Sequence, residues 1–274
     1  MNKYLLSLLL LFAFHQCEAK QPLVDTVNIR SKLMQQDFKC VVIKPDNYKH
    51  RKMRFPVVYL LHGYSGKYSD WVKKMNDIQI YASLYNLIIV CPDGGFSSWY
   101  TDSPVDSSFR YESYIIDEIV PFIDAHFRTM TGSKNRGITG LSMGGHGATM
   151  LALHHPAIFG AAASMSGAVD LKEVVNRFDA SLRLGDTTTN RKYWNYYSVL
   201  KIADTLQNGR ISLLIDCGTR DIFIKGNRAL HEKLLARNIN HDYVERTGEH
   251  NWAYWTNALP FHLQFFRKFF DERK

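Results

Sequence analysis

The feature that most restricts how this chain can fold is a set of short apolar segments without alternation of polar and apolar residues. Segments 57–61 (VVYLL) and 87–91 (LIIVC) are the clearest. An unbroken apolar strand is buried on both faces, which is typical of a parallel sheet with helices on each side. Strands are predicted at 24–30, 38–44, 57–61, 87–91, 136–140, 161–165, 211–216 and 242–245.

Segments with helical periodicity lie between these strands. Helices are predicted at 111–127, 146–155, 227–237 and 252–270, the last with a kink at Pro260. The first two strands have no helix between them, so we expect them to pair as an antiparallel hairpin. Residues 172–198 lack a strong period and are expected to form an insertion over the sheet edge. Together these segments predict one α/β domain.

The first 19 residues have the pattern of an export signal rather than of the fold. Lys3 precedes an apolar stretch at 5–14, which is too short to cross a bilayer comfortably. Cys17 and Ala19 place small residues before a cleavage site, which predicts a signal peptide at 1–19 and a single domain at 20–274. The expected location is secreted or periplasmic, without a membrane span.

Cys17 also allows a second interpretation, in which the cysteine carries a lipid anchor. The residues just before a lipidated cysteine are usually small, but here they are His15 and Gln16. Anchoring through Cys17 is therefore the less favoured alternative.

The balance of charge does not indicate a nucleic-acid binder. The chain has 34 lysines and arginines against 26 aspartates and glutamates, a formal net charge of +8. These basic residues are scattered, and the densest run, 49–54, precedes an apolar strand and is interpreted as a solvated turn. A weak attraction to acidic polymers or to an anionic surface is the alternative.

Three further cysteines, Cys40, Cys91 and Cys217, lie in apolar segments. They form no CxxC motif, so buried free thiols are favoured, and one disulfide remains the alternative for an exported chain. The sequence has no HExxH, no dinucleotide fingerprint and no P-loop. Neither a metal nor a cofactor is expected.

The sequence Gly140-Leu141-Ser142-Met143-Gly144 follows a predicted strand and precedes a predicted helix. A serine in this strand–turn–helix setting is typical of a nucleophile elbow. The turn brings the residues two before and two after the serine together, so both must be small. Ser142 Oγ would stand at the carboxyl end of the sheet, above a helix N-terminus that stabilises negative charge. The alternative is a glycine-rich turn for close packing.

A serine nucleophile needs a general base, and the base needs an acid that orients it. In elbow architectures the chain order is serine, acid, histidine. His250 lies in a turn after the last predicted strand, at the same sheet edge as Ser142, and is the predicted base. Asp221, in the loop after strand 211–216, is the predicted acid, and Asp216 at the end of that strand is the alternative.

A developing oxyanion needs N–H donors that are already in place. One is predicted to be the amide of Met143, directly after the nucleophile. The other is predicted to be the amide of Tyr64, in the loop that follows strand 57–61. Gly63 allows this loop to turn, and His62 is interpreted as a structural hydrogen-bonding residue rather than as a second base.

Several of these motifs also carry a resemblance to a known family. They are 61–63, 92–102, 140–147, 217–221 and 248–252. With them the chain resembles the esterase D family of α/β-hydrolases, which includes S-formylglutathione hydrolases, tributyrin-type esterases, mycolyltransferases, and feruloyl and acetyl xylan esterases. The resemblance implies an α/β-hydrolase fold with a mostly parallel sheet of about eight strands.

The resemblance implies the same site residues: Ser142, Asp221 and His250 as a triad, with the amides of Tyr64 and Met143 as an oxyanion hole. It also implies that Trp99 walls the acyl pocket, with plain core packing as the alternative. Gly63 and Trp252 are the other residues expected to contact substrate.

The resulting hypothesis is an exported serine carboxylesterase that acts through an acyl-enzyme. The predicted substrates are acetyl or feruloyl esters of carbohydrates, or short-chain acyl esters, because exported relatives often act on plant polysaccharides. The export signal argues against the cytosolic formylglutathione reaction. Two alternatives are an acyltransferase on the same scaffold and a non-catalytic binding protein with a hydrolase-like fold.

Overall fold

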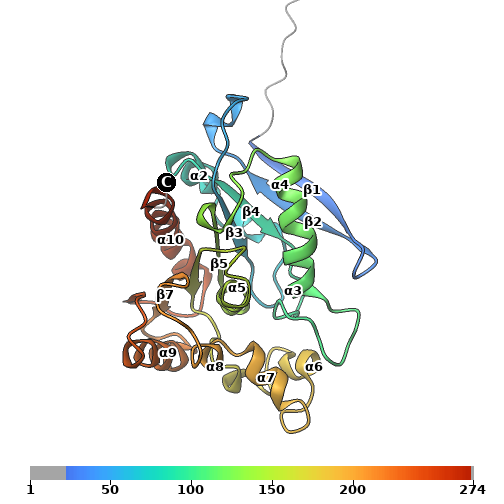
Figure 1. Ribbon diagram of the computed structural model, residues 1–274, viewed down its shortest axis with the longest axis vertical. Helices are drawn as coiled ribbons and strands as arrows, with labels where there is room; N and C mark the ends of the chain where they lie inside the picture. Colours follow the sequence, from blue (N-terminus) through green and yellow to red (C-terminus); the bar gives the residue numbers. More distant parts are fainter. Residues whose placement is uncertain (1–22, 273–274) are drawn as a thin grey trace, which may run out of the picture.

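The structure is a computed structural model that describes residues 23–272 (Figure 1). The predicted signal peptide and Cys17 lie outside the described residues. The strands are β1 Val24–Ser31, β2 Gln36–Ile43, β3 Val57–Leu61, β4 Ile88–Pro92, β5 Arg136–Leu141, β6 Ala161–Met165, β7 Ser212–Gly218 and β8 Asp242–Arg246.

The α-helices are α1 Asp70–Lys74, α2 Ile78–Leu84, α3 Tyr111–Ser113, α4 Val120–His126, α5 Met143–His154, α6 Ala180–Leu184, α7 Arg191–Tyr197, α8 Val199–Ile202, α9 Ile224–Ala236 and α10 Trp252–Glu272. A π-helical turn at Tyr114–Ile119 joins α3 to α4, and short 3₁₀ turns occur at Asp46–Lys49, Ser133–Asn135 and Leu171–Val174. None of the helices in residues 23–272 is long and apolar enough to cross a membrane.

All eight strands form one sheet in the order β1-β2-β4-β3-β5-β6-β7-β8. Strands β1 and β2 pair antiparallel, as predicted, and β2 also runs antiparallel to β4. Every other pairing is parallel. The predicted α/β-hydrolase fold, with a mostly parallel sheet of eight strands, is therefore confirmed.

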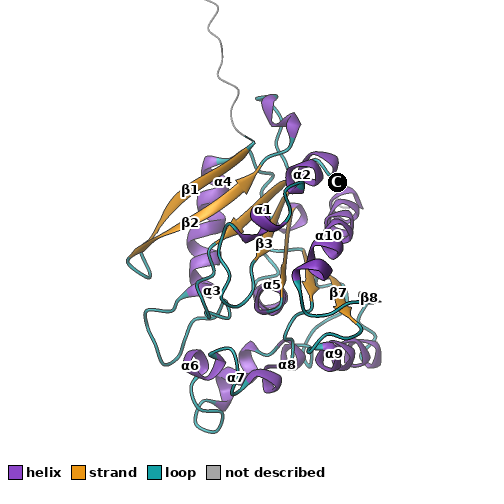
Figure 2. Cartoon of the chain, turned by 180° about the vertical axis from the view of Figure 1, so that it is seen from behind, coloured by secondary structure: helices purple, strands orange, loops and turns teal. Residues whose placement is uncertain are grey.

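Two apolar cores, one on each face of the sheet, explain the unbroken apolar strands. In β3, Tyr59 packs into the core that contains residues of α4, α5 and α9, whereas Val58 and Leu60 pack into the core beneath α1, α2 and α10. Figures 1 and 2 show α4 and α10 on opposite faces of the sheet. If such a strand alternated polar and apolar residues, its polar side chains would be buried under a helical layer without hydrogen-bond partners.

The predicted helix 111–127 is helical throughout but is not a single α-helix. Its middle is the π-helical turn, and Pro121 stands in the first turn of α4. Proline has no N–H to donate, so the hydrogen-bond ladder has to rearrange where it enters the helix. Helix α10, by contrast, continues through Pro260.

The segment predicted as an insertion, 172–198, carries α6 and α7. It lies against the loops that follow β3 and β4. The indole of Trp99 donates to the carbonyl of Phe178 at 2.9 Å, and the hydroxyl of Tyr64 donates to Asp179 at 3.3 Å. The insertion thereby borders the carboxyl end of the sheet, where the candidate site lies.

Cys40, Cys91 and Cys217 are buried free thiols. Burial raises the pKa of each thiol far above its usual value, so all three are inert side chains of the core. The favoured interpretation of the sequence is confirmed, and the disulfide alternative is not realised among them.

Candidate active site

Ser142 lies between the end of β5 and the start of α5, in the turn predicted as a nucleophile elbow. Its backbone has φ 54° and ψ −118°, outside the regions that residues with a side chain prefer. Steric contacts require glycine on both sides of the serine, at positions 140 and 144. A Cβ on Gly144 would lie 2.5 Å from the carbonyl oxygen of His62, and one on Gly140 would lie 2.6 Å from that of Gly144.

The predicted base meets the serine. Nε2 of His250 lies 2.8 Å from Oγ of Ser142, and Nδ1 lies 2.9 Å and 3.0 Å from the two carboxylate oxygens of Asp221. Because Asp221 offers only acceptors when ionised, the Nδ1–H donates to it, and Nε2 is left to accept the serine proton. The structure thus brings the three residues together in one line of hydrogen bonds.

Asp221 is held rigidly in this arrangement. Its side chain is fully buried, and one of its oxygens also accepts the backbone N–H of Phe223 at 2.8 Å. The imidazole of His250 packs nearly perpendicular to two aromatic rings, Phe223 at 5.1 Å and Trp255 at 5.0 Å between centroids. These contacts leave little rotational freedom for the imidazole.

Asp216, the alternative acid, has other partners. Its buried carboxylate in β7 accepts from Arg246 and from the hydroxyl of Tyr254, and it lies 3.4 Å from Nε2 of His262. Burial alone would raise the pKa of Asp216, but His262, Tyr254 and Arg246 outweigh burial and lower it. Asp216 is therefore an ionised structural group that ties β7 to β8 and α10.

The loop after β3 packs directly on the elbow. A Cβ on Gly63 would lie 2.5 Å from Leu141 and 3.5 Å from the Cβ of Ser142. Within residues 23–272, the amide of Tyr64 has no hydrogen-bond acceptor, whereas the next amide, that of Ser65, donates to Phe96. Met143 is the first residue of α5, so its amide lacks an acceptor inside the helix. Both predicted oxyanion donors thus remain available beside Ser142.

His62 has the structural role expected for it. Its Nδ1–H donates to the carbonyl of Gly63, and its Nε2 accepts the amide of Gly94, both at 2.8 Å. Burial lowers the pKa of His62, so the imidazole is neutral, as these two bonds require. The imidazole thereby fixes the loop that carries Tyr64.

Two aromatic residues predicted to contact substrate lie in different surroundings. Trp99 is 1% exposed and, besides its bond to Phe178, it packs edge-on to His146. Burial favours the packing interpretation for Trp99 over direct contact with substrate. Trp252 is partly exposed at the start of α10, two residues after His250, and packs against Trp71 and Trp255.

An aromatic cluster that was not predicted from the sequence lies beside the elbow. Tyr64 packs edge-on to Phe96 at 4.9 Å and to Phe178 at 5.4 Å between centroids, and Phe96 is 59% exposed. Phe178 comes from the insertion, whose lack of periodicity concealed its position. Phe96 stands within the motif 92–102, so the motif indicated its place but not its exposure.

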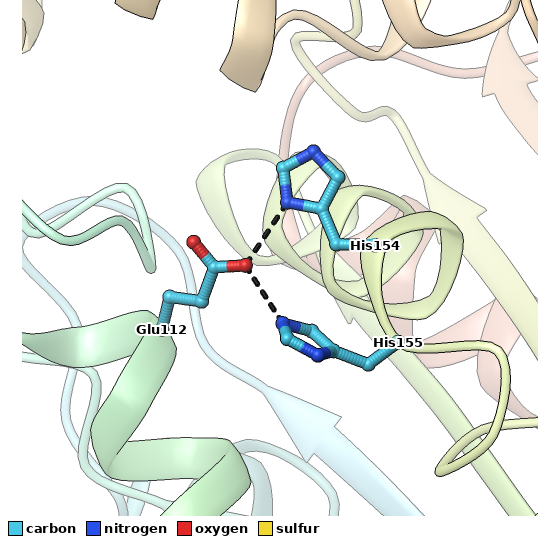
Figure 3. Close-up of side chains that lie close together, drawn as sticks. All are labelled: Glu112, His154 and His155. Atoms are coloured by element: carbon cyan, nitrogen blue, oxygen red, sulfur yellow. Dashed lines mark hydrogen bonds and ion pairs between the residues drawn. The ribbon is translucent and has the colours of Figure 1, made fainter.

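A second missed group consists of Glu112, His154 and His155 (Figure 3). Glu112 lies 42 positions before the adjacent His154 and His155. The three residues match no metal motif, so no metal ligands were expected from the sequence. The structure brings their side chains together at the end of α5 distant from Ser142.

Comparison with known proteins is consistent with this geometry. The family model described as putative esterase matches residues 31–266. An esterase of Mycobacterium tuberculosis is 30% identical in an alignment 235 residues long that covers 76% of this chain and 51% of the relative. The chain thus spans about half the length of that relative.

Two further comparisons extend over most of both chains. An acetyl esterase of Caldicellulosiruptor saccharolyticus is 24% identical over 89% of this chain and 98% of the relative. The solved structure of a ferulic acid esterase has a TM-score of 0.78 and 25% identity, and the match covers 90% of this chain and 98% of the other. On the match over residues 31–266, this chain belongs to the putative esterase family.

Proposed function

We propose that this protein is a serine carboxylesterase whose nucleophile is Ser142. The observation that carries the proposal is the unbroken line of hydrogen bonds from Asp221 through His250 to Ser142, with contacts of 2.9 Å and 2.8 Å. A serine hydroxyl is a weak nucleophile unless a neighbouring base takes its proton, and here the base is already in contact.

In the first half of the reaction, Ser142 Oγ attacks the ester carbonyl while Nε2 of His250 removes the hydroxyl proton. Asp221 keeps the imidazole in the correct tautomer and stabilises the imidazolium. The amides of Tyr64 and Met143 donate to the oxyanion of the tetrahedral intermediate. The intermediate collapses to an acyl-serine, and His250 passes its proton to the leaving alcohol.

In the second half, water takes the place of the alcohol. His250 removes a proton from the water as it attacks the acyl-serine, and the same amides stabilise the second oxyanion. Collapse releases the carboxylic acid, and the proton on His250 returns to Ser142 Oγ.

The proposed substrates are acetyl or feruloyl esters of carbohydrates, or short-chain acyl esters. Two comparisons support this class, the acetyl esterase relative and the ferulic acid esterase structure. The exposed ring of Phe96, next to Tyr64, offers an apolar surface on which a planar acyl group could pack. We further propose that residues 20–274 form one exported domain after removal of the leader at 1–19.

Acyl transfer is a second candidate because it uses the same acyl-serine. One relative, a diacylglycerol acyltransferase/mycolyltransferase of Mycolicibacterium smegmatis, is 25% identical over 74% of this chain. A transferase would deliver the acyl group to an acceptor hydroxyl in place of water. Ester products formed on adding sugar acceptors would distinguish the two activities.

The test is hydrolysis of a substrate panel combined with active-site labelling. The panel contains p-nitrophenyl acetate, butyrate and octanoate, methyl ferulate and acetylated xylan. We expect turnover of acetyl or feruloyl substrates and labelling by a fluorophosphonate at Ser142, which is absent in Ser142→Ala. No turnover and no labelling would reject the proposal in favour of a non-catalytic protein.

A further inference from the structure

Glu112, His154 and His155 converge on one point outside the candidate active site (Figure 3). Nδ1 of His154 lies 2.9 Å, and Nε2 of His155 lies 2.8 Å, from the same carboxylate oxygen of Glu112. The three ligand atoms all lie within 4.8 Å of one another, and no other trio of His, Cys, Asp or Glu in residues 23–272 does so.

The end of α5 makes this convergence achievable. Neighbouring residues of a continuous helix point in directions about 100° apart and do not face a common partner. His154 is the last residue of α5, and His155 leaves the helix with φ −122° and ψ 58°. This change of backbone direction turns the second imidazole toward the same oxygen as the first.

The hydrogen bonding of the group requires a proton or a cation between His154 and Glu112. The second nitrogen of His154, Nε2, lies 3.0 Å from the carbonyl oxygen of Tyr196, so it must carry a hydrogen and donate. In a neutral imidazole the other nitrogen, Nδ1, then presents a lone pair to Glu112. A lone pair and a carboxylate oxygen repel at 2.9 Å unless a proton or a cation lies between them.

The group is only partly open to solvent. The side chains of Glu112 and His154 are each 9% exposed, and that of His155 is 31% exposed. The group is therefore sheltered but accessible from the side of His155.

We propose that Glu112, His154 and His155 form a Zn²⁺ site. Two imidazole nitrogens and one carboxylate oxygen are a common zinc ligand set, which leaves a fourth tetrahedral position for water. On binding, Zn²⁺ replaces the protons shared with the carboxylate, and those protons leave to solvent. The bond from His154 Nε2–H to Tyr196 is the outer contact that orients metal-binding histidines in proteins.

Two of the three ligand separations need only a small change to admit the ion. Ligands about 2.0–2.1 Å from a tetrahedral ion lie roughly 3.3 Å apart. The present separations of 2.8 Å and 2.9 Å therefore have to widen by about half an ångström. His155 provides this movement most readily, since it lies beyond the end of α5 and is partly exposed.

The role that follows for the ion is structural. It would tie α3 to the end of α5 and, through Tyr196, to α7. The twelve residues of α5 separate this group from Ser142 by about 18 Å, at a rise of about 1.5 Å per residue. A ligand that binds only the folded state stabilises it, so zinc is expected to raise the melting temperature.

Calorimetric titration of the untagged, chelator-treated protein with zinc chloride tests the proposal. We expect one equivalent of zinc to bind and the melting temperature to rise. His155→Gln is the main variant because its side chain is the most exposed of the three, and Glu112→Gln is the second. Loss of an outer contact typically weakens metal binding at least tenfold. Loss of a direct ligand is expected to weaken zinc binding by at least that factor.

The matched control is His241→Gln. His241 forms another histidine pair, in which its Nε2 lies 2.8 Å from Nδ1 of His231. The control is expected to bind zinc like the unmodified protein. Zinc binding that is absent from the unmodified protein, unchanged in folded His155→Gln, or lost in His241→Gln would overturn the proposal.

Discussion

His250 reaches Ser142 across 108 residues of sequence, and its Nε2 lies 2.8 Å from the serine Oγ. Both residues stand at the carboxyl end of parallel strands, Ser142 after β5 and His250 after β8. A parallel sheet gathers such chain ends along one edge, so side chains far apart in sequence meet there without any special connection. The candidate site is thus a consequence of the fold class that the apolar strands predict.

Of the two candidate acids, Asp221 is expected to support catalysis and Asp216 is expected to support stability. Asp221→Asn removes the acceptor that fixes the His250 tautomer, so kcat is expected to fall by about 10⁴-fold with little change in stability. Asp216→Asn breaks the buried contacts with Arg246 and Tyr254, so it is expected to lower the melting temperature and to leave kcat within a few-fold. Kinetics and thermal unfolding of both variants check this, and an interchange of the two phenotypes would make Asp216 the acid.

Gly144, two residues after the nucleophile, is expected to be intolerant of a methyl group. In Gly144→Ala the new Cβ would lie 2.5 Å from a backbone oxygen of His62, which cannot move without displacing the loop that carries Tyr64. We expect a loss of more than about 2 kcal/mol of unfolding free energy, together with a loss of activity.

Gly209→Ala is the control for that substitution. Its Cβ would meet nothing within 4 Å, although φ is +74°. Only the backbone penalty remains, so we expect a loss of about 1 kcal/mol and full activity. Urea unfolding compares the two variants, and equal losses would contradict the steric explanation.

Buried His146 is expected to make the fold sensitive to acid. Burial lowers its pKa to about 4, while an unfolded histidine titrates near 6.5. Between these values the unfolded chain binds the proton and the native state does not, so stability falls as the pH falls from about 6.5 to 4.

The loss of unfolding free energy caused by His146 is of the order of 3 kcal/mol once the pH has fallen below about 4, because each pKa unit corresponds to about 1.4 kcal/mol. Unfolding free energies of the unmodified protein and of His146→Gln across this pH window measure it. The variant is expected to show the shallower pH dependence, and identical slopes would contradict the assignment to His146.

The exposed ring of Phe96 is expected to contribute to recognition of aromatic acyl groups. Phe96→Ala removes the ring that packs on Tyr64 and is predicted to raise KM for methyl ferulate several-fold. For p-nitrophenyl acetate, whose acyl group is too small to cover this ring, we expect unchanged kinetics. Phe261→Ala, in an exposed phenylalanine of α10, is the control, and an equal effect of both variants would contradict the role of Phe96.

Much of the fold and of the candidate site could be predicted from the sequence because the relevant signals are local. An apolar strand buried on both faces shows as an unbroken apolar run, as in β3 and β4. The other predicted strands also lie within a few residues of the observed ones, although β1 and β8 are not buried on both faces. The elbow shows as two glycines around Ser142 between a strand and a helix. Chain order together with the turn after the last predicted strand pointed to His250 as the base, whereas Asp216 and Asp221 both stayed open until their partners were known.

The rest depends on contacts that leave no local pattern. The insertion that contains Phe178 has no strong period, and its position is set by bonds such as that from the Trp99 indole. Helix α5 begins at Met143, earlier than predicted, because the carbonyl of Ser142 accepts the amide of His146. The group of Glu112 and His154 joins residues 42 positions apart, which no spacing rule anticipates.

The most direct test of the central claim is the steady-state kinetics of Ser142→Ala on an ester that the unmodified protein hydrolyses. Replacement of the nucleophile removes the acyl-enzyme route and leaves the fold intact, as near-ultraviolet circular dichroism would verify. If Ser142 is the nucleophile, kcat is expected to fall by at least about 10³-fold. A folded variant that retained a tenth of the original turnover would contradict the assignment of Ser142 as the nucleophile.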